Sequence, residues 1–412
     1  MAARRAEGLV LQRDGHRGQT VVTFDIDAVA YLRGDDGAQA LRVTAERALT
    51  GDALIADIAA LRTRFGDRAA VLAETVRLRR RAAAKLSGAE DWLFTDEALQ
   101  QATATPVAEH RAMRLAGARV HDATCSIGAE LVTLRRHADL VVGSDIDPVR
   151  LAMARHNTEL GGGGVMLCRA DALHPVTRDT VVVLDPARRS GGRRTFDPAA
   201  YTPPLDAVLD LYRGRPHVVK CAPGIDFDAV RRLGSTGEIE VVSAGGGVRE
   251  ACLWSAELSS PAVTRRAALL DTGEELTDAE PDDCDVAPAG RWIIDPDGAV
   301  VRAGLVRHYA ARHGLWQLDP AIAYLSGDRL PTGVRGFEVI EQLAFHERRL
   351  RQALHAHDGG AVEILVRGVD VDPDALRKRL KPRGSARLSV VITRLGSGTA
   401  SRATAFLCRP SH

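Results

Sequence analysis

The residues best suited to chemistry in this chain are acidic side chains that end apolar runs. Asp122 ends the run that begins at Arg119, and Asp145 comes 23 residues later, directly after the run Leu140–Ser144. The segment Ala123–Gly128 between the two runs consists mainly of small residues, as in a turn. This pattern predicts a strand–turn–helix–strand unit whose second carboxylate can reach a pair of ribose hydroxyls. We therefore expect a nucleoside-containing cofactor.

The glycine content of the turn favours one cofactor over another. A dinucleotide site needs G-x-G-x-x-G to bring a pyrophosphate close to the backbone, whereas this turn contains only Gly128. Asp122 at the head of the turn would repel a pyrophosphate, but its carboxylate can accept a hydrogen bond from the ammonium group of an amino acid. S-adenosylmethionine is therefore favoured over NAD. An ordinary strand–turn–helix of an α/β protein remains the alternative for this stretch alone.

Polar residues also follow three later apolar runs. These runs are expected to be strands over Val165–Arg169, Thr180–Leu184 and His217–Lys220. The polar residues at or just beyond their ends are Asp171, Asp185 and Lys220. Buried parallel strands are near-continuous apolar runs, and ligands bind at their carboxyl ends, so we expect these side chains to share one sheet edge with Asp122 and Asp145. For each residue taken singly, a role as a strand-ending turn residue is the alternative.

The elements between these strands predict the class of the fold. Helices are expected over Ala129–His137 and Pro148–Leu160, the second with proline at its first position. Glu238–Ala244 and Arg249–Glu257 are expected to form a terminal strand pair. Strands alternating with helices are typical of an α/β protein with a parallel sheet. Residues 116–258 are therefore expected to form a Rossmann-like domain.

Residues 1–115 are expected to form an α-helical N-terminal domain. Apolar residues recur at helical spacing in three segments, Ala38–Leu49, Asp52–Phe65 and Ala69–Leu86. The basic cluster on the third segment is interpreted as a solvated helix face. Further along, Thr95 and Thr105 are candidate N-caps, the second followed by Pro106. That stretch is either a helix whose N-terminus covers the cofactor pocket or a linker between domains.

The chain after residue 258 is expected to have a mixed α+β pattern, with a connecting region over 259–335 and a basic domain over 336–412. Strands are expected over Ala262–Leu270, Arg291–Ile294, Gly336–Glu341, Val362–Arg367, Leu388–Arg394 and Ala403–Arg409. Helices are expected over Val301–His313, Leu343–His355 and Pro373–Leu380. The acidic stretch Glu274–Asp285 has no period and is expected to be a surface loop or disordered.

Basic side chains concentrate near the end of the chain. The stretch from Ala375 to His412 contains nine arginines and lysines and no acidic residue. Such a local excess is typical of a phosphate-binding surface, and RNA is the expected partner; a solvated face is the alternative. Phe406 is the stretch's single aromatic residue, which favours recognition of RNA backbone or shape over base stacking. The candidate substrate-binding residues here are Arg377, Lys378, Arg379 and Lys381.

Composition limits the number of domains, the classes of binding partner and the cellular compartment. A chain of 412 residues, 45% of them hydrophobic, suffices for two or three domains with buried cores. The net charge of +1 gives no global attraction to nucleic acid or membranes. The six scattered cysteines lack the spacing of a zinc site, and no metal is implied. Without an apolar signal region or a run of about 18 apolar residues, we expect a cytoplasmic protein with no membrane association. The oligomeric state is left open.

Taken together, these residues show a family likeness. The region from Arg119 to Glu257 resembles the class I S-adenosylmethionine-dependent methyltransferases. In that family the turn after strand one holds the methionine part of the cofactor, the acid after strand two holds the ribose, and the acid after strand three meets the adenine amine. The resemblance places Ile146 against the adenine ring. It implies a cofactor site made of Asp122, Thr124, Cys125, Gly128, Asp145, Ile146, Asp171 and Ala172.

The segment after strand four matches the amino-methylating members of this family in part. Those members carry Asp or Asn, two prolines and an aromatic residue, so that oxygen atoms accept hydrogen bonds from the target amine while the ring stacks on the base. This chain has Asp185-Pro186-Ala187-Arg188, which keeps the acid and the first proline and lacks the second proline and the ring. Asp185 and Pro186 are the expected catalytic residues, and Arg188 and Lys220 are expected to contact the substrate.

Two further segments extend the resemblance. Thr105–His110 is similar to the approach helix of the trimethylguanosine synthase group, which methylates the guanine exocyclic amine of RNA, and this adds Thr105 to the expected cofactor site. Arg367–Pro410 is similar to the C-terminal THUMP-like domain of a bacterial branch of methyltransferases. The resemblance implies RNA methylation at an exocyclic base amine of the guanine N2 type. A protein or small-molecule methyltransferase, and a non-catalytic protein that binds cofactor or RNA, are the alternatives.

Overall fold

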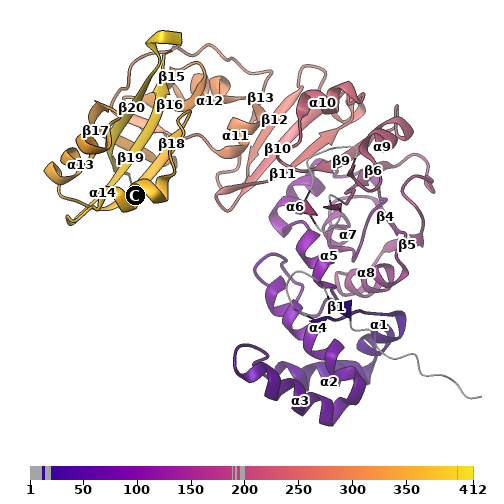
Figure 1. Ribbon diagram of the computed structural model, residues 1–412. Helices are drawn as coiled ribbons and strands as arrows, with labels where there is room; N and C mark the ends of the chain where they lie inside the picture. Colours follow the sequence, from indigo (N-terminus) through magenta and orange to yellow (C-terminus); the bar gives the residue numbers. More distant parts are fainter. Residues whose placement is uncertain are drawn as a thin grey trace, which may run out of the picture. The chain divides into compact units, whose positions relative to one another are not determined.

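The computed structural model describes residues 12–13, 20–187, 189–190, 193–194, 200–396 and 398–411. The chain divides into two compact units (Figure 1). The first comprises Met1–Thr236 with Leu253–Leu258, and the second comprises Gly237–Cys252 with Ser259–His412. Helices and strands occur in both units.

The first unit begins with four helices, α1 (Ile26–Arg33), α2 (Asp35–Ala45), α3 (Ala53–Phe65) and α4 (Ala69–Ala82). Their apolar faces share one core with Ile127 and Met153 of the following part of the chain. Helix α1 was not predicted, and α2 begins earlier than expected. The start of α1 is marked by a capping residue and not by a periodic pattern of apolar residues. Asp25 Oδ1 accepts a hydrogen bond from Ala28 N at 2.6 Å.

Two short helices follow in place of the single predicted one, α5 (Asp96–Gln101) and α6 (Thr105–Arg114). Thr95 is the N-cap of α5, as predicted, and accepts a hydrogen bond from Ala98 N at 3.1 Å. The prediction for Thr105 was wrong, because the N-cap of α6 is Ala104. Thr105 Oγ1 instead accepts a hydrogen bond from Ser87 N at 2.9 Å.

Five parallel strands form the sheet of the first unit, in the order β9-β6-β3-β4-β5. Their bounds are β3 (Arg119–Asp122), β4 (Leu140–Asp145), β5 (Val165–Arg169), β6 (Val181–Leu184) and β9 (His217–Cys221). Asp122 lies opposite Gly143 on one side and Val183 on the other, so the carboxyl ends of the central strands lie side by side. The predicted Rossmann-like α/β arrangement is confirmed.

Helices connect these strands as the sequence predicts. They are α7 (Ala129–Leu134), α8 (Pro148–Leu160), α9 (Leu205–Leu211) and α10 (Phe227–Arg232). Asp147 caps α8 by accepting from Val149 N at 2.8 Å, and proline stands in its first turn. Two pairs of two-residue strands complete the unit: β1 (Gln12–Arg13) with β2 (Thr20–Val21), and β7 (Arg189–Ser190) with β8 (Arg193–Arg194).

The second unit begins with four strands, β10 (Glu238–Ala244), β11 (Gly247–Trp254), β12 (Arg265–Leu269) and β13 (Glu274–Thr277). Strand β13 corrects the expectation of a loop or disorder over the acidic stretch Glu274–Asp285. Leu276 is buried opposite Ala267 of β12, while Glu274 and Glu275 pair with arginines. Those ion pairs let a charged sequence form an edge strand, which a composition argument cannot anticipate.

A seven-stranded sheet follows, in the order β15-β16-β14-β17-β20-β19-β18. Its strands are β14 (Trp292–Ile294), β15 (Trp316–Asp319), β16 (Ile322–Gly327), β17 (Gly336–Ala344), β18 (Gly359–Arg367), β19 (Ala386–Leu395) and β20 (Arg402–Pro410). The helices of this part are α11 (Gly298–Ala303), α12 (Val306–His313), α13 (Glu347–Ala356) and α14 (Pro373–Leu380). Strands β15 and β16 were not predicted. The helix predicted over Val301–His313 is divided in two, because Gly304 adopts a left-handed conformation with φ of 73°.

Every helix in the described part of the chain is too short or too polar to cross a lipid bilayer.

Candidate active site

A cavity of about 450 Å³ lies at the carboxyl ends of the parallel strands. Its walls come from the turn after β3, from the ends of β4, β5 and β6, from β9, and from the end of α5. Nine side chains or backbone segments singled out in the sequence line it together: Asp122, Thr124, Cys125, Asp145, Ile146, Asp171, Ala172, Asp185 and Lys220. Residues scattered over about a hundred positions thus converge because the strands that carry them are parallel and adjacent.

The turn after β3 is held by its own polar groups. Asp122 is buried, and its Oδ1 accepts a hydrogen bond from Thr124 N at 3.1 Å. The hydroxyl of Thr124 accepts from Asp185 N at 2.6 Å, which ties this turn to the end of β6. Ser126 has a φ of 49°, a conformation that side chains rarely adopt, so the turn holds local strain at the cavity wall.

Gly128 does not line the cavity, so the structure assigns it no direct cofactor contact. Its φ is 78°, and a Cβ at this position would lie 3.1 Å from the Ala154 side chain and 3.3 Å from that of Thr158. The glycine is needed for the left-handed turn and for close packing of the turn against α8.

Asp145 is positioned before any ligand arrives. Its two carboxylate oxygens accept backbone hydrogen bonds from Ser126 N and Asp147 N, each at 2.9 Å. A carboxylate has about four lone-pair sites, so both oxygens retain capacity for hydroxyl donors. The neighbouring Ile146 is 62% exposed despite being apolar, which leaves a hydrophobic surface beside the carboxylate. A sugar diol with an attached flat ring suits this pair.

The end of β5 supplies a second carboxylate. Asp171 Oδ1 accepts a hydrogen bond from Leu173 N at 2.9 Å, and the side chain is partly open to solvent. The carbonyl of Ala172 accepts from the Tyr212 hydroxyl at 2.7 Å, which fixes the backbone beside it. The other oxygen of Asp171, Oδ2, lies 3.6 Å from Nδ1 of the exposed His174 and retains lone pairs suited to an amine donor.

Comparison with known proteins identifies the family. The chain is 69% identical over 357 residues to an uncharacterized S-adenosylmethionine-dependent methyltransferase of Mycobacterium tuberculosis, found in two strains; the match covers 85% of this chain and all of the relative. The chain belongs to the S-adenosylmethionine-dependent methyltransferases. It is an enzyme of that class, and S-adenosylmethionine is its cofactor.

Two further comparisons concern the C-terminal domain of the methyltransferase and the fold of almost the whole chain. Residues 334–410 match the THUMP domain-like family, which confirms the predicted THUMP-like domain. The crystal structure of a protein from Porphyromonas gingivalis W83 that is assigned as a methyltransferase has a similar fold, with a TM-score of 0.73 and 20% sequence identity, over 95% of this chain and all of that one.

The cavity fits the methyltransferase's cofactor in its chemistry. The buried Asp122 carboxylate suits an ammonium group, Asp145 suits a ribose, and Ile146 offers an apolar face to a base. Asp122 and Asp145 come from adjacent strands, so they can contact different parts of one molecule.

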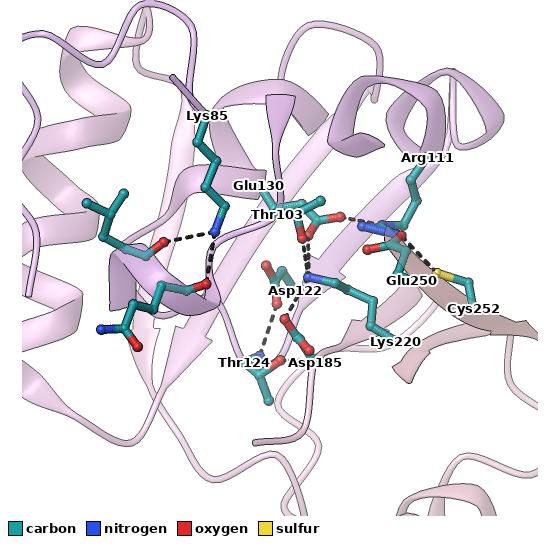
Figure 2. Close-up of polar contacts among 12 residues, drawn as sticks. Lys85, Thr103, Arg111, Asp122, Thr124, Glu130, Asp185, Lys220, Glu250 and Cys252 are labelled. Atoms are coloured by element: carbon teal, nitrogen blue, oxygen red, sulfur yellow. Dashed lines mark hydrogen bonds and ion pairs between the residues drawn. The ribbon is translucent and has the colours of Figure 1, made fainter. Parts of the chain in front are cut away.

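Several lining residues of the cavity belong to a largely buried polar network in the methyltransferase (Figure 2). Lys220 Nζ donates to Asp185 Oδ2 at 2.6 Å, to Glu130 Oε2 at 3.2 Å and to the Thr103 hydroxyl. Glu130 in turn accepts a hydrogen bond from Arg111 Nε of α6. Lys220, Glu130 and Arg111 are buried, Thr103 is half-buried, and Asp185 opens into the cavity.

Two carboxyls of this region have opposite pKa shifts. Burial raises the pKa of Asp122 to about 8, helped by the negative charge of Glu130. Burial alone would also raise the pKa of Glu130, but Arg111 and Lys220 outweigh it and hold that pKa at about 2. Glu130 is therefore ionised at neutral pH, while Asp122 is largely protonated until a cation enters the cavity.

Sequence reasoning missed three residues of the polar network, Thr103, Arg111 and Glu130, and misplaced others. Thr103 and Glu130 line the cavity, whereas Thr105 lies outside it, bonded to Ser87. The sequence signal for Glu130 was a single charge within the otherwise uncharged helix α7. Pro186 is buried and is not part of the cavity lining. Arg188 lies outside the described residues.

The basic residues of the THUMP-like domain do not form a single track. Arg377 lines a shallow cavity of about 610 Å³ with Arg335 and Arg387. A separate cavity of about 480 Å³ contains Arg379, Lys381, Arg383 and Arg351 among its lining residues. Lys378 is exposed and lines neither cavity. Ion pairs also neutralise part of the charge: Arg377 with Asp374 at 2.6 Å and Arg379 with Glu347 at 2.9 Å.

Among the described residues, histidine, cysteine and acidic side chains nowhere gather in groups of three or more that could hold a metal ion.

Proposed function

We propose that this methyltransferase methylates an exocyclic amine of a base in RNA, of the guanine N2 type. Asp185 carries the proposal. Its Oδ2 is taken by Lys220, and within the part of the chain that the structure describes its Oδ1 is left to accept a hydrogen bond in the cavity. A neutral amine that donates one N–H to this oxygen would turn its nitrogen lone pair toward the methyl group.

The cofactor contacts follow the chemistry of the wall. We assign the ammonium of S-adenosylmethionine to Asp122, its ribose to Asp145, and its adenine to Ile146, Asp171 and Ala172, while Thr124 and Cys125 shape the turn beside the methionine part. When bound, S-adenosylmethionine supplies a methyl group activated by its sulfonium. Asp185, with the rigid Pro186 behind it, orients the acceptor. A strong general base is not required, because the amine can lose its proton after transfer.

The two basic cavities of the THUMP-like domain support RNA as the substrate. Their exposed cations include Lys381, Arg383 and Arg387, and among the described residues none of these three forms a salt bridge, although Arg387 shares its cavity with Glu363. Cations in concave surfaces bind phosphates and release counterions, independently of base sequence. The methyl acceptor would then be selected by Asp185, and the RNA held by its backbone.

Transfer of tritiated methyl groups tests the proposal. The purified enzyme and labelled S-adenosylmethionine are incubated with total RNA, total protein and a metabolite extract, each from cells that lack the gene. Label is expected in the RNA fraction, and nuclease digestion with chromatography should identify N2-methylated guanosine. Asp185→Ala should reduce incorporation by about a hundredfold or more, since orientation of the amine is lost. Label confined to protein or metabolites would contradict RNA as the substrate.

A further inference from the structure

The ammonium group of Lys220 is fully engaged inside the protein. A lysine ammonium has three N–H donors, and here they meet three acceptors: Asp185 Oδ2, Glu130 Oε2 and the Thr103 hydroxyl. The side chain is 5% exposed. A substrate could take a hydrogen bond from Lys220 only by displacing one of these partners, so direct substrate binding, as expected from the sequence, is disfavoured.

The contacts of Glu130 with Arg111 and Lys220 hold Lys220 in place. Glu130 is held between Lys220 and Arg111, and both Glu130 and Arg111 are buried. Removing Lys220 from this place would leave a buried, ionised carboxylate without one of its two cations, which is strongly unfavourable. The chain Arg111–Glu130–Lys220–Asp185 alternates in charge and ends at the cavity (Figure 2).

Asp185 is the member of this chain that a ligand can reach. Its side chain retains 25% exposure, against 5% for Lys220 and 9% for Glu130. Lys220 fixes one carboxylate oxygen, so the other can present its lone pairs to the cavity in a constant orientation. The same ammonium cancels the charge of Asp185, so this end of the cavity offers a hydrogen-bond acceptor without a net negative charge.

We propose that Lys220 is a positioning residue for Asp185, and that the pair selects an electrically neutral nitrogen as the methyl acceptor. This deepens the proposed function and rests on the contact assigned there between Asp185 and the acceptor. A neutral amine on an aromatic ring donates to Asp185 and keeps a lone pair aligned for attack. A lysine or arginine side chain would bring a second cation against the Lys220 ammonium, with no carboxylate left to neutralise it.

Identification of the natural product tests the selection of a neutral acceptor without any variant. The tritium-labelled product of the wild-type enzyme is digested, and the methylated group is identified by mass spectrometry. Methyl on a base amine, or on the neutral amine of a small aromatic molecule, supports the inference; the second of these outcomes would overturn RNA as the substrate while leaving the inference standing. Methyl-lysine or methyl-arginine would overturn the inference.

A double-mutant cycle tests the positioning role. Lys220→Met keeps the length of the side chain and removes its charge; kcat should fall by about a hundredfold, with the dissociation constant for S-adenosylmethionine within a few fold. In an Asp185→Asn background, Lys220→Met should cause no further loss of kcat, since Lys220 acts through Asp185.

Thermal unfolding and cofactor binding by calorimetry accompany each variant. If Lys220→Met alone does not fold, the cycle is repeated in a Glu130→Gln background, which removes the buried charge that Lys220 would leave unpaired. A folded Lys220→Met enzyme with normal kcat would overturn the positioning role. Additive losses in the double variant would overturn it as well.

Discussion

At the residue scale, the cavity shows how two carboxyls of one wall acquire different protonation states. Asp122 and Glu130 are both buried. The contacts of Glu130 with Arg111 and Lys220 stabilise its anion, whereas Asp122 has a backbone N–H at 3.1 Å. Their pKa values of about 2 and about 8 follow from those partners. From the sequence, Asp122 and Asp145 were identifiable because strand ends mark them, but the partners of Glu130 are distant in sequence.

The protonation of Asp122 predicts a pH dependence of cofactor binding. In the free enzyme its pKa is raised to about 8 by burial and by Glu130, so the carboxyl carries a proton below that pH. Binding of an ammonium group favours the ionised form, and the proton must leave. Affinity for S-adenosylmethionine should therefore rise with pH, by about tenfold per unit between pH 6 and 7 and less steeply as the pH approaches 8. Calorimetry in buffers of different ionisation enthalpy measures both the affinity and the release of about one proton.

The matched variant is Asp122→Asn, which cannot ionise. It should bind the cofactor more weakly than the wild type and with almost no dependence on pH over the same range. Above about pH 8 the amino group of the cofactor loses its own proton, so the affinity of the wild type should decline again. A flat affinity profile for the wild type between pH 6 and 8 would remove Asp122 from contact with the ammonium group.

Asp145 gives a second prediction at this scale. Asp145→Ala removes the charge-assisted hydrogen bond proposed to the ribose and the anchor for Ser126 N, so binding should weaken by about 1.5–3 kcal/mol, or roughly ten- to more than a hundredfold. Asp147→Ala is the control, because it removes the N-cap of α8 outside the cavity. The control should lower stability by about 1 kcal/mol and leave the affinity within a few fold. Equal effects of the two variants would exclude Asp145 as a ribose ligand.

At the scale of elements, the five parallel strands of the first unit were predicted within a residue or two, and the wall of the cavity above them was not. Buried parallel strands are apolar runs, so β3, β4, β6 and β9 can be read locally. The wall from Ala98 to Thr103 depends instead on long-range capping. Lys85 donates to the carbonyls of Leu99 and Gln100, both at 2.9 Å, and so holds the end of α5 (Figure 2). Distances of about fifteen residues in sequence carry no periodic signal, so Thr103 was not singled out, while Thr105 entered the expected site through the resemblance of Thr105–His110 to an approach helix.

Asn157 is expected to be the main polar link that joins α8 to the segment at Leu93 and to the turn after β3. It is buried in α8, where its amide donates to Leu93 O at 3.0 Å and to Ile127 O at 2.9 Å and accepts from Leu93 N at 2.8 Å. Asn157→Ala leaves three buried backbone groups unpaired, which should lower the free energy of unfolding by about 2–4 kcal/mol. It should also weaken cofactor binding, because Ile127 lies in the cavity wall.

Thermal denaturation and calorimetry measure both effects. The matched control is Thr63→Ala, which removes a hydrogen bond to Ala59 O on the exposed face of α3 and should change the free energy of unfolding by less than about 0.5 kcal/mol. If Asn157→Ala and Thr63→Ala unfold at the same temperature, the turn is held by other contacts.

At the scale of the whole molecule, the sequence predicted the α/β class and the THUMP-like domain, but merged the basic residues into one surface. Residues of an α-helix are rotated by about 100° from one to the next, so neighbours in sequence point apart. Arg377 contacts Val362 O of β18 at 2.8 Å, Arg379 pairs with Glu347 of α13, and Lys378 lies between them in solvent. A run of charges on a helix therefore predicts basic character, while the number and place of the binding surfaces require the fold.

This division predicts which charges RNA binding depends on. Lys381 and Arg383 line the cavity beside α13, so Lys381→Glu with Arg383→Glu should weaken RNA binding irrespective of base sequence and leave cofactor affinity unchanged. Each lost phosphate contact should flatten the slope of log affinity against log salt by about 0.7 for single-stranded RNA. Arg348→Glu with Arg349→Glu is the control of equal charge change, on exposed positions of α13 that line neither basic cavity. Binding measured by fluorescence anisotropy at several salt concentrations should show a flatter slope for the first pair than for the control. Equal slopes would mean that net charge, and not the cavity, attracts RNA.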